Sequence, residues 1–183
     1  QEQDGLTDVI QVTLEDGRTR ALDEENLQKV VGQACADLAE VDANAIIEET
    51  KRNLFNGIKI GDLHKALIMS ARTKIEIEPN YSFVAARLLL NDLHYEALKF
   101  LALPMTHTDE EKVALYPQVF QKFIEVGIEH ELLSEELRTF DLERLGQALK
   151  IERDRQFTYL GLQTLYDRYF IHHRDTRFEL PQI

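Results

Sequence analysis

Apolar residues recur at helical spacing along most of this chain, which predicts a mainly α protein. Four helices are expected in the first half and three in the second. The first three begin after Asp23, after Asp42 and at Gly61, and the fourth opens at Asn80 or Ser82 and runs from Phe83 to about Ala102. The later three are expected at 109–126, 142–151 and 155–169.

A short β-hairpin precedes the helices. Residues 9–14 and 18–22 have the alternating character of strands, and Asp16-Gly17 between them is a typical turn. A two-stranded ribbon is marginally stable alone, so we expect it to lie as a lid on a four-helix bundle. Such a lid suits a nucleotide pocket, but this turn presents Leu14, Glu15 and Asp16 rather than cations.

The chain divides into three parts on this reading. Residues 1–8 form a polar tail, residues 9–103 form the lid and bundle, and residues 104–183 form a second helical segment. The boundary is placed at 103–108, where Pro104 precedes a polar stretch. Residues 168–183 become extended around a polar turn at 172–176. Since the chain starts at Gln1 and ends on an apolar lead-in, we expect a piece of a longer polypeptide.

Composition narrows the possible partners. The net charge of −12 argues against a nucleic-acid backbone and against an acidic membrane surface. No uncharged stretch approaches the roughly 20 residues that span a bilayer. The single cysteine, Cys35, excludes an internal disulfide and fits a reducing compartment, so we expect a cytoplasmic protein.

No constellation typical of catalysis or of metal binding is present in the sequence. Glycine-rich phosphate loops and zinc-ligand spacings are absent. Cys35, beside two alanines, is interpreted as a packing residue. The adjacent His172 and His173 would point to opposite faces of an extended segment, which favours a solvent-exposed turn. His64, near a helix start, is a half-buried structural residue in one interpretation and a ligand contact at the open end of the bundle in the other.

Three tyrosines in the second half complete the set of candidates. Tyr159, Tyr166 and Tyr169 are interpreted as one packing stripe in the core and at an interface, with no catalytic role.

The first hundred residues resemble an ATP-cone, the regulatory module at the amino end of many ribonucleotide reductases. The segments that carry the resemblance are 12–17 (VTLEDG), 53–58 (NLFNGI), 61–64 (GDLH) and 81–88 (YSFVAARL). The second half resembles the start of the large subunit of a class I ribonucleoside-diphosphate reductase. It does so through 127–133 (GIEHELL), 151–159 (IERDRQFTY), 165–170 (LYDRYF) and 178–183 (FELPQI).

The resemblance implies a nucleotide pocket that has lost its cations. In the family pattern the hairpin reads Val-x-Lys-Arg-Asp-Gly, and its basic pair falls here on Leu14 and Glu15. A lysine that the family pattern places early in the first helix falls on Asn26. A threonine that it places one turn before His64 falls on Ile60. A lysine of the fourth helix falls within 94–96 (HYE).

Part of the family pattern is retained. Val12, Asp16, Gly17 and His64 keep it and, with Asn26, form an expected vestigial pocket. A triphosphate needs Lys, Arg or a metal to offset its desolvation, and Glu15 adds repulsion instead. We therefore expect a degenerate cone that binds ATP or dATP with magnesium weakly or not at all.

The same resemblance implies the role of the intact protein. Such a subunit reduces ribonucleoside diphosphates with cysteines that would lie beyond Ile183, so this segment is expected to be non-catalytic and to hold no cofactor or metal. Its expected role is regulation and assembly with other large subunits and with the small radical-generating subunit. A cone of this kind can also be the second of a tandem pair, with the functional cone upstream.

Two alternatives stay open at this point. One is a functional ATP/dATP module with a rearranged pocket, in which Arg18, Arg20 or His64 supplies positive charge. The other is a helical adaptor unrelated to reductases, for which both sets of motifs would be coincidental.

Overall fold

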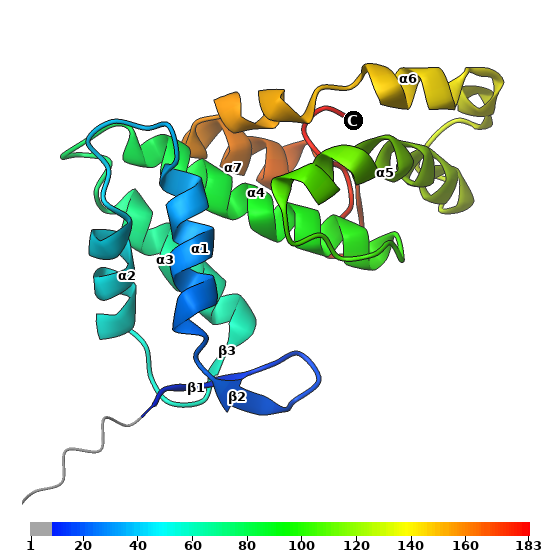
Figure 1. Cartoon of the computed structure of the whole chain (residues 1–183). Coiled ribbons are helices and arrows are strands. Elements are labelled where there is room, and N and C mark those ends of the chain that lie inside the picture. The colour runs from blue at the N-terminus through cyan, green and yellow to red at the C-terminus, as the bar shows by residue number, and fades with distance from the viewer. Residues whose placement is uncertain (1–8) are drawn as a thin grey trace, which may run out of the picture. The chain divides into compact units, whose positions relative to one another are not determined.

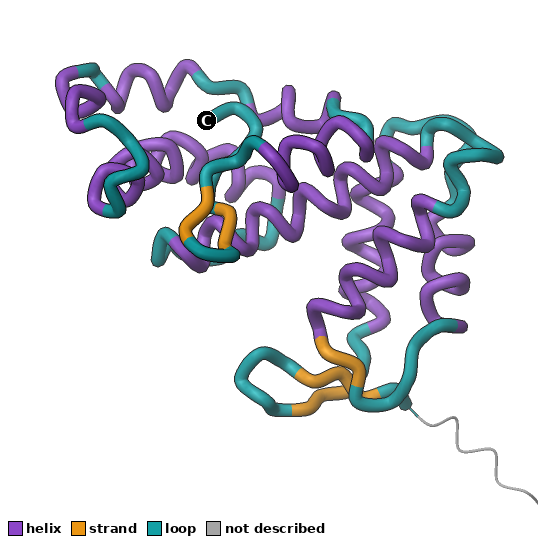
Figure 2. The backbone as a smooth tube through the Cα atoms, turned by 180° about the vertical axis from the view of Figure 1, so that it is seen from behind, coloured by secondary structure: helices purple, strands orange, loops and turns teal. Residues whose placement is uncertain are grey.

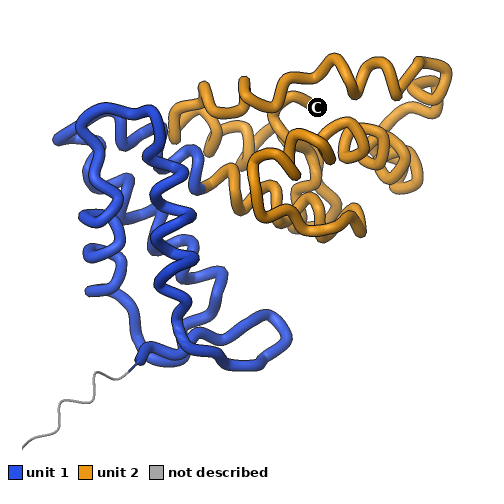
Figure 3. The backbone as a smooth tube through the Cα atoms, viewed as in Figure 1, with its two compact units in different colours: residues 1–88 blue, residues 89–183 orange. Residues whose placement is uncertain are grey.

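The computed structural model describes residues 9–183 and confirms a mainly helical chain with a small sheet. The polar tail expected at 1–8 lies outside the described residues. Two compact units divide at residues 88 and 89 (Figure 3), inside a helix. The domain boundary at 103–108 stays a prediction.

The first unit holds a small sheet at one end of its helices (Figure 1). Its elements are β1 (Gln11–Thr13), β2 (Thr19–Ala21), α1 (Glu24–Cys35), α2 (Ala43–Arg52), β3 (Ile58–Lys59), α3 (Ile60–Arg72) and the start of α4 (Tyr81–Phe100). The strand order is β2-β1-β3, with β1 antiparallel to β2 and parallel to β3. The hairpin is confirmed, but the sequence did not reveal β3, because a two-residue strand shows no alternation.

The hairpin is shorter than the sequence predicted. Its strands have three residues each, and the turn closes through Leu14 N–H donating to the Arg18 carbonyl at 2.8 Å. Gly17 sits at φ +82°, a left-handed conformation that glycine adopts without strain. This gives a three-residue loop of Glu15, Asp16 and Gly17, a common hairpin connection.

Side-chain caps fix the helix ends in this unit. The carboxylates of Asp23 and Asp42 accept from the backbone N–H groups of Asn26 and Asn44, at 2.9 and 2.8 Å, and both helices begin after these residues as predicted. Each such cap is worth about 1 kcal/mol. Arg87 on α4 donates to the carbonyls of residues 34 and 36 at 3.1 and 2.7 Å, and so satisfies the carboxyl end of α1.

The second unit is built from the rest of α4, further helices and a two-stranded hairpin, drawn in orange with the other strands in Figure 2. Its elements are α5 (Asp109–Glu129), η1 (Glu135–Thr139), α6 (Leu142–Ala148), η2 (Ile151–Gln156), α7 (Tyr159–Arg168), β4 (His172–His173) and β5 (Thr176–Arg177). The helix expected at 142–151 ends at Ala148, since Leu149 is extended, with ψ 145°. The helix expected at 155–169 begins only at Tyr159, where the Thr158 hydroxyl caps it.

Two interpretations of aromatic residues are corrected in part. The tyrosine stripe does not lie in the core, because Tyr169 is 69% exposed and Tyr159 and Tyr166 are only half-buried; its place at an interface stays a prediction. The turn expected at 172–176 is confirmed at residues 174–175, but His172 and His173 themselves form β4. Their opposite facing is confirmed, since His172 is exposed while the His173 ring lies 4.2 Å from that of His130.

One carboxyl group is buried in the second unit. Asp154 on η2 is 2% exposed and accepts a 2.9 Å hydrogen bond from the Tyr116 hydroxyl of α5. Burial raises the pKa of Asp154 to about 6, although the Tyr116 hydrogen bond opposes this shift. The charged carboxylate is therefore costly in the folded state at neutral pH.

This burial predicts a pH-dependent stability. The folded pKa lies above the unfolded value, so the contribution of Asp154 is fully present below pH about 4 and is lost as pH rises through 6. Relative to Asp154→Asn, we expect the wild-type free energy of unfolding to fall by on the order of 2 kcal/mol from pH 4 to pH 7. Urea titrations at several pH values measure this. Glu135→Gln, at an exposed carboxyl group on η1 in the same unit, is the control, and parallel profiles for wild type and Asp154→Asn would contradict the prediction.

Candidate functional site

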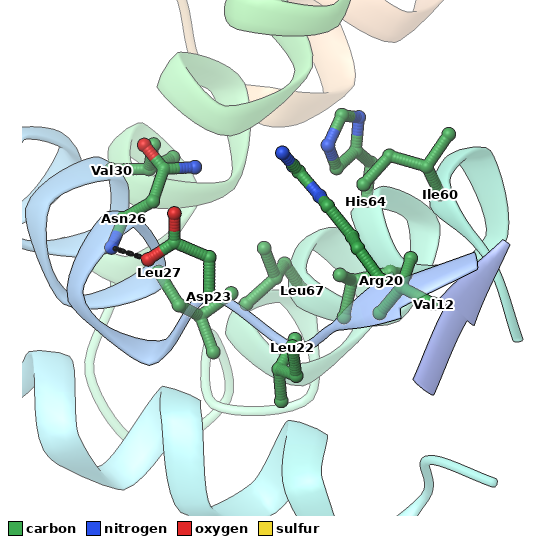
Figure 4. Close-up of a pocket in the computed structure, with 11 residues that line it drawn as sticks. Val12, Arg20, Leu22, Asp23, Asn26, Leu27, Val30, Ile60, His64 and Leu67 are labelled. Atoms are coloured by element: carbon green, nitrogen blue, oxygen red, sulfur yellow. Dashed lines mark hydrogen bonds between the residues drawn. The ribbon is translucent and has the colours of Figure 1, made fainter. Parts of the chain in front are cut away.

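The site is a small pocket between the hairpin, α1 and α3 in the first unit. Its cavity volume is about 50 Å³. The lining residues are Val12, Arg20, Leu22, Asp23, Asn26, Leu27, Val30, Ile60, Leu63, His64 and Leu67 (Figure 4). Most of these side chains are apolar, so the pocket offers far more hydrophobic wall than charge.

The apolar wall is anchored by a small core cluster under the sheet. Val12, Ile58 and Leu63 are each at most 4% exposed, and Ile60 packs against them. Backbone and side-chain bonds hold β1 beside the loop before β3. The Gln11 N–H donates to the Asn56 amide oxygen at 2.8 Å, and the Gly57 N–H donates to the Gln11 carbonyl at 2.8 Å. These two hydrogen bonds hold β1, and with it the sheet side of the pocket, in place.

The structure brings together three of the five residues predicted for the pocket. Val12, Asn26 and His64 all line it, although they come from β1, α1 and α3. Asp16 and Gly17 instead lie in the hairpin turn and are not among its lining residues. Asp16 forms a 2.6 Å ion pair with Arg18, and the Arg18 hydrogen bonds hold the pKa of Asp16 below its usual value.

The charged rim consists of one cation, one anion and a histidine. Val12 and Arg20 are register partners in the antiparallel pair, so their side chains share a face and Arg20 reaches the pocket. In Figure 4 the Arg20 side chain extends from β2 over the pocket, with Asn26 drawn on one side of its guanidinium and His64 on the other. Asp23 faces the same space, while its carboxylate caps α1.

Arg20 is the residue whose importance sequence analysis underrated. Within residues 9–183, its guanidinium has no hydrogen-bond or ion-pair partner, whereas Arg18 is held by Asp16. The signal that could have selected it is the hairpin register, since a residue opposite an inward-facing valine lies on the inward face.

The positions that correspond to family cations lack positive charge. Leu14 is half-buried and Glu15 is exposed, both at the hairpin turn. Ile60 adds a methyl-rich surface to the pocket wall. His94 lies in the second unit and is 6% exposed, and burial together with the nearby Lys112 lowers its pKa to about 3, which keeps it neutral at pH 7.

Comparisons with known proteins define the class. Residues 10–96 match the ATP cone domain family. The chain therefore contains an ATP-cone, an allosteric regulatory module, which confirms the family resemblance and the fold of its first half.

The particular protein family follows from similarity along nearly the whole of this chain, which spans about a fifth of the length of the relatives it matches. The chain is 37% identical over 193 aligned residues to the ribonucleoside-diphosphate reductase subunit alpha of Chlamydia trachomatis, covering 100% of this chain and 18% of the relative. It is 32% identical to that subunit of Helicobacter pylori, covering 95% of this chain and 21% of the relative. For subunit alpha of the Escherichia coli K12 reductase 1, identity is 26% and the shares are 90% and 20%. The chain is homologous to the amino-terminal part of ribonucleoside-diphosphate reductase alpha subunits.

The described residues contain no cluster of metal ligands and no membrane-spanning helix. No group of three or more His, Cys, Asp or Glu side chains is placed to hold a metal ion anywhere in 9–183. None of the helices in this part of the chain is long and apolar enough to cross a bilayer.

Proposed function

We propose that this chain is the regulatory and assembly portion of a ribonucleotide reductase large subunit, and that its cone binds ATP or dATP weakly or not at all. In this proposal the intact subunit reduces ribonucleoside diphosphates for DNA synthesis. This segment contributes surfaces to other large subunits and to the small radical-generating subunit. Cys35 is the single cysteine of the segment, and its pKa is raised to about 11 mainly by burial, so the segment supplies no reactive thiol pair for the reduction and is proposed to be non-catalytic by itself.

The charge of the pocket supports the weak binding. Its lining holds a single permanent cation, Arg20, and that charge is opposed by Asp23. A triphosphate brings several negative charges, and each needs a cation or several donors to replace its hydration. The rest of the lining is mostly apolar, so it offers few donors that could replace the hydration of a triphosphate and its magnesium.

Calorimetric titration of the chain with dATP and magnesium tests this proposal. We expect a dissociation constant in the millimolar range or no measurable heat. A single arginine lines the pocket, and it cannot offset the cost of desolvating several phosphate charges. The negative control is dATP titrated into buffer, and a thermal-shift series provides a second measurement. Micromolar dATP binding would refute a degenerate cone.

The placement of Arg20 favours one second candidate, an effector module with a rearranged pocket. The guanidinium extends over the pocket beside His64, so some positive charge has moved from the hairpin turn to β2. Under this alternative, dATP shifts the amide resonances of β2 and α3 and binds in the micromolar range. The same titration therefore separates the two candidates.

A further inference from the structure

We propose that this pocket binds a ligand with a single anionic group on an apolar or aromatic body, in preference to a triphosphate. The inference rests on the proposed function, since it assigns a ligand class to the pocket of the degenerate cone. The observation behind it is the pairing of one unpartnered guanidinium with an apolar wall.

The anionic group belongs beside Arg20. Among the described residues its guanidinium has no ion-pair or hydrogen-bond partner, and in Figure 4 it extends over the pocket. A planar guanidinium can donate two parallel hydrogen bonds to one phosphate or carboxylate. The amino end of α1 offers no competing anion site, because the carboxylate of Asp23 already accepts from the Asn26 N–H at 2.9 Å.

The other residues that line the pocket limit the ligand to one anionic group. Asp23 faces the pocket from α1, so further negative charge on the ligand meets repulsion rather than a second cation. The charge balance thus suits one headgroup and disfavours a chain of phosphates.

The body of the ligand belongs on the apolar wall. Leu22 lies in the connection between β2 and α1, Val30 on α1 and Leu67 on α3, and all three line the same space. Because the cavity itself is only about 50 Å³, a ring larger than a few atoms lies across its mouth rather than inside it. Burial of apolar ligand surface against these side chains supplies the favourable free energy that the single ion pair does not.

Titration of the chain with AMP, ATP and adenosine, followed by calorimetry and amide spectra, tests the inference. We expect AMP to bind at least about tenfold more tightly than adenosine, and more tightly than ATP, with shifts at β2, α1 and α3. Titration with benzoate tests whether the anionic group is a carboxylate rather than a phosphate. Tighter binding of benzoate than of AMP would assign it as a carboxylate. No binding of AMP or benzoate at millimolar concentration overturns the inference and leaves the proposed function standing. Micromolar binding of ATP that exceeds AMP overturns both.

A pair of matched variants locates the anion. Arg20→Gln removes the charge over the pocket, and Arg18→Gln removes the same charge from the same hairpin, where it pairs with Asp16. We expect Arg20→Gln to weaken binding at least about tenfold and Arg18→Gln to change it less than about twofold. Equal losses in the two variants overturn the assignment of the anion to Arg20. Amide shifts of α2 that match the wild type in the unliganded Arg20→Gln variant exclude misfolding as the cause.

Discussion

Replacing Leu14 by Lys and Glu15 by Arg is expected to raise the affinity of the chain for dATP with magnesium by at least about tenfold. The change restores the basic pair that the family pattern places on the hairpin and removes the repulsion from Glu15. One charge-assisted hydrogen bond is worth about 1.5–3 kcal/mol, and 1.4 kcal/mol corresponds to a factor of ten. Both positions have exposed or half-buried side chains at a turn, so the fold should tolerate the change.

A control with the same change in net charge tests whether the gain is local. Leu145→Lys with Glu143→Arg changes one exposed leucine and one exposed glutamate on α6, in the second unit. Calorimetry should show the gain only for the hairpin variant. Equal gains would indicate general attraction of an anion to a less acidic protein. No gain in either variant would mean that the pocket has lost more than its two hairpin cations.

Most of the fold could be predicted because its signals are local in the sequence. Helix caps at Asp23 and Asp42 and the Asp16-Gly17 turn each depend on residues within a few positions, and all three are present in the structure. The strand β3 could not be predicted, because it is defined by its pairing with Val12 and Thr13, about 45 residues earlier in the chain. The same limit explains why α6 and α7 differ from their predicted bounds, since short 3₁₀ turns have no clear period.

The site shows the same division between local and long-range information. Val12, Asn26 and His64 were selected through the family resemblance, and the structure brings them to one pocket. Arg20 needed the hairpin register, which sequence alone left undetermined by one or two residues. Whether the pocket holds a nucleotide depends on charge balance, which neither periodicity nor fold specifies.

The carboxyl-terminal segment was predicted only as extended, yet it supplies the most buried aromatic residue of the second unit. Phe178 is 0% exposed, and its ring lies 4.8 Å from that of Phe100 on α4 and 5.4 Å from that of Phe123 on α5. Phe178→Ala should therefore lower the free energy of unfolding of this unit by about 3–5 kcal/mol, through lost transfer free energy and the cavity left behind. Urea titration followed by near-ultraviolet circular dichroism measures the change.

Phe140→Ala is the matched control for this prediction, because Phe140 lies in the same unit and is 59% exposed. Its expected cost is below about 1 kcal/mol, since most of its ring remains in water in the folded state. If Phe178→Ala does not fold, Phe178→Leu keeps most of the volume and should cost about 1–2 kcal/mol, because it loses the contacts between the rings. Equal midpoints for Phe178→Leu and Phe140→Ala, with both close to wild type, would show that the segment after β5 does not pack on α4 and α5 in solution. A clear separation of the two would establish that this segment completes the core of the second unit.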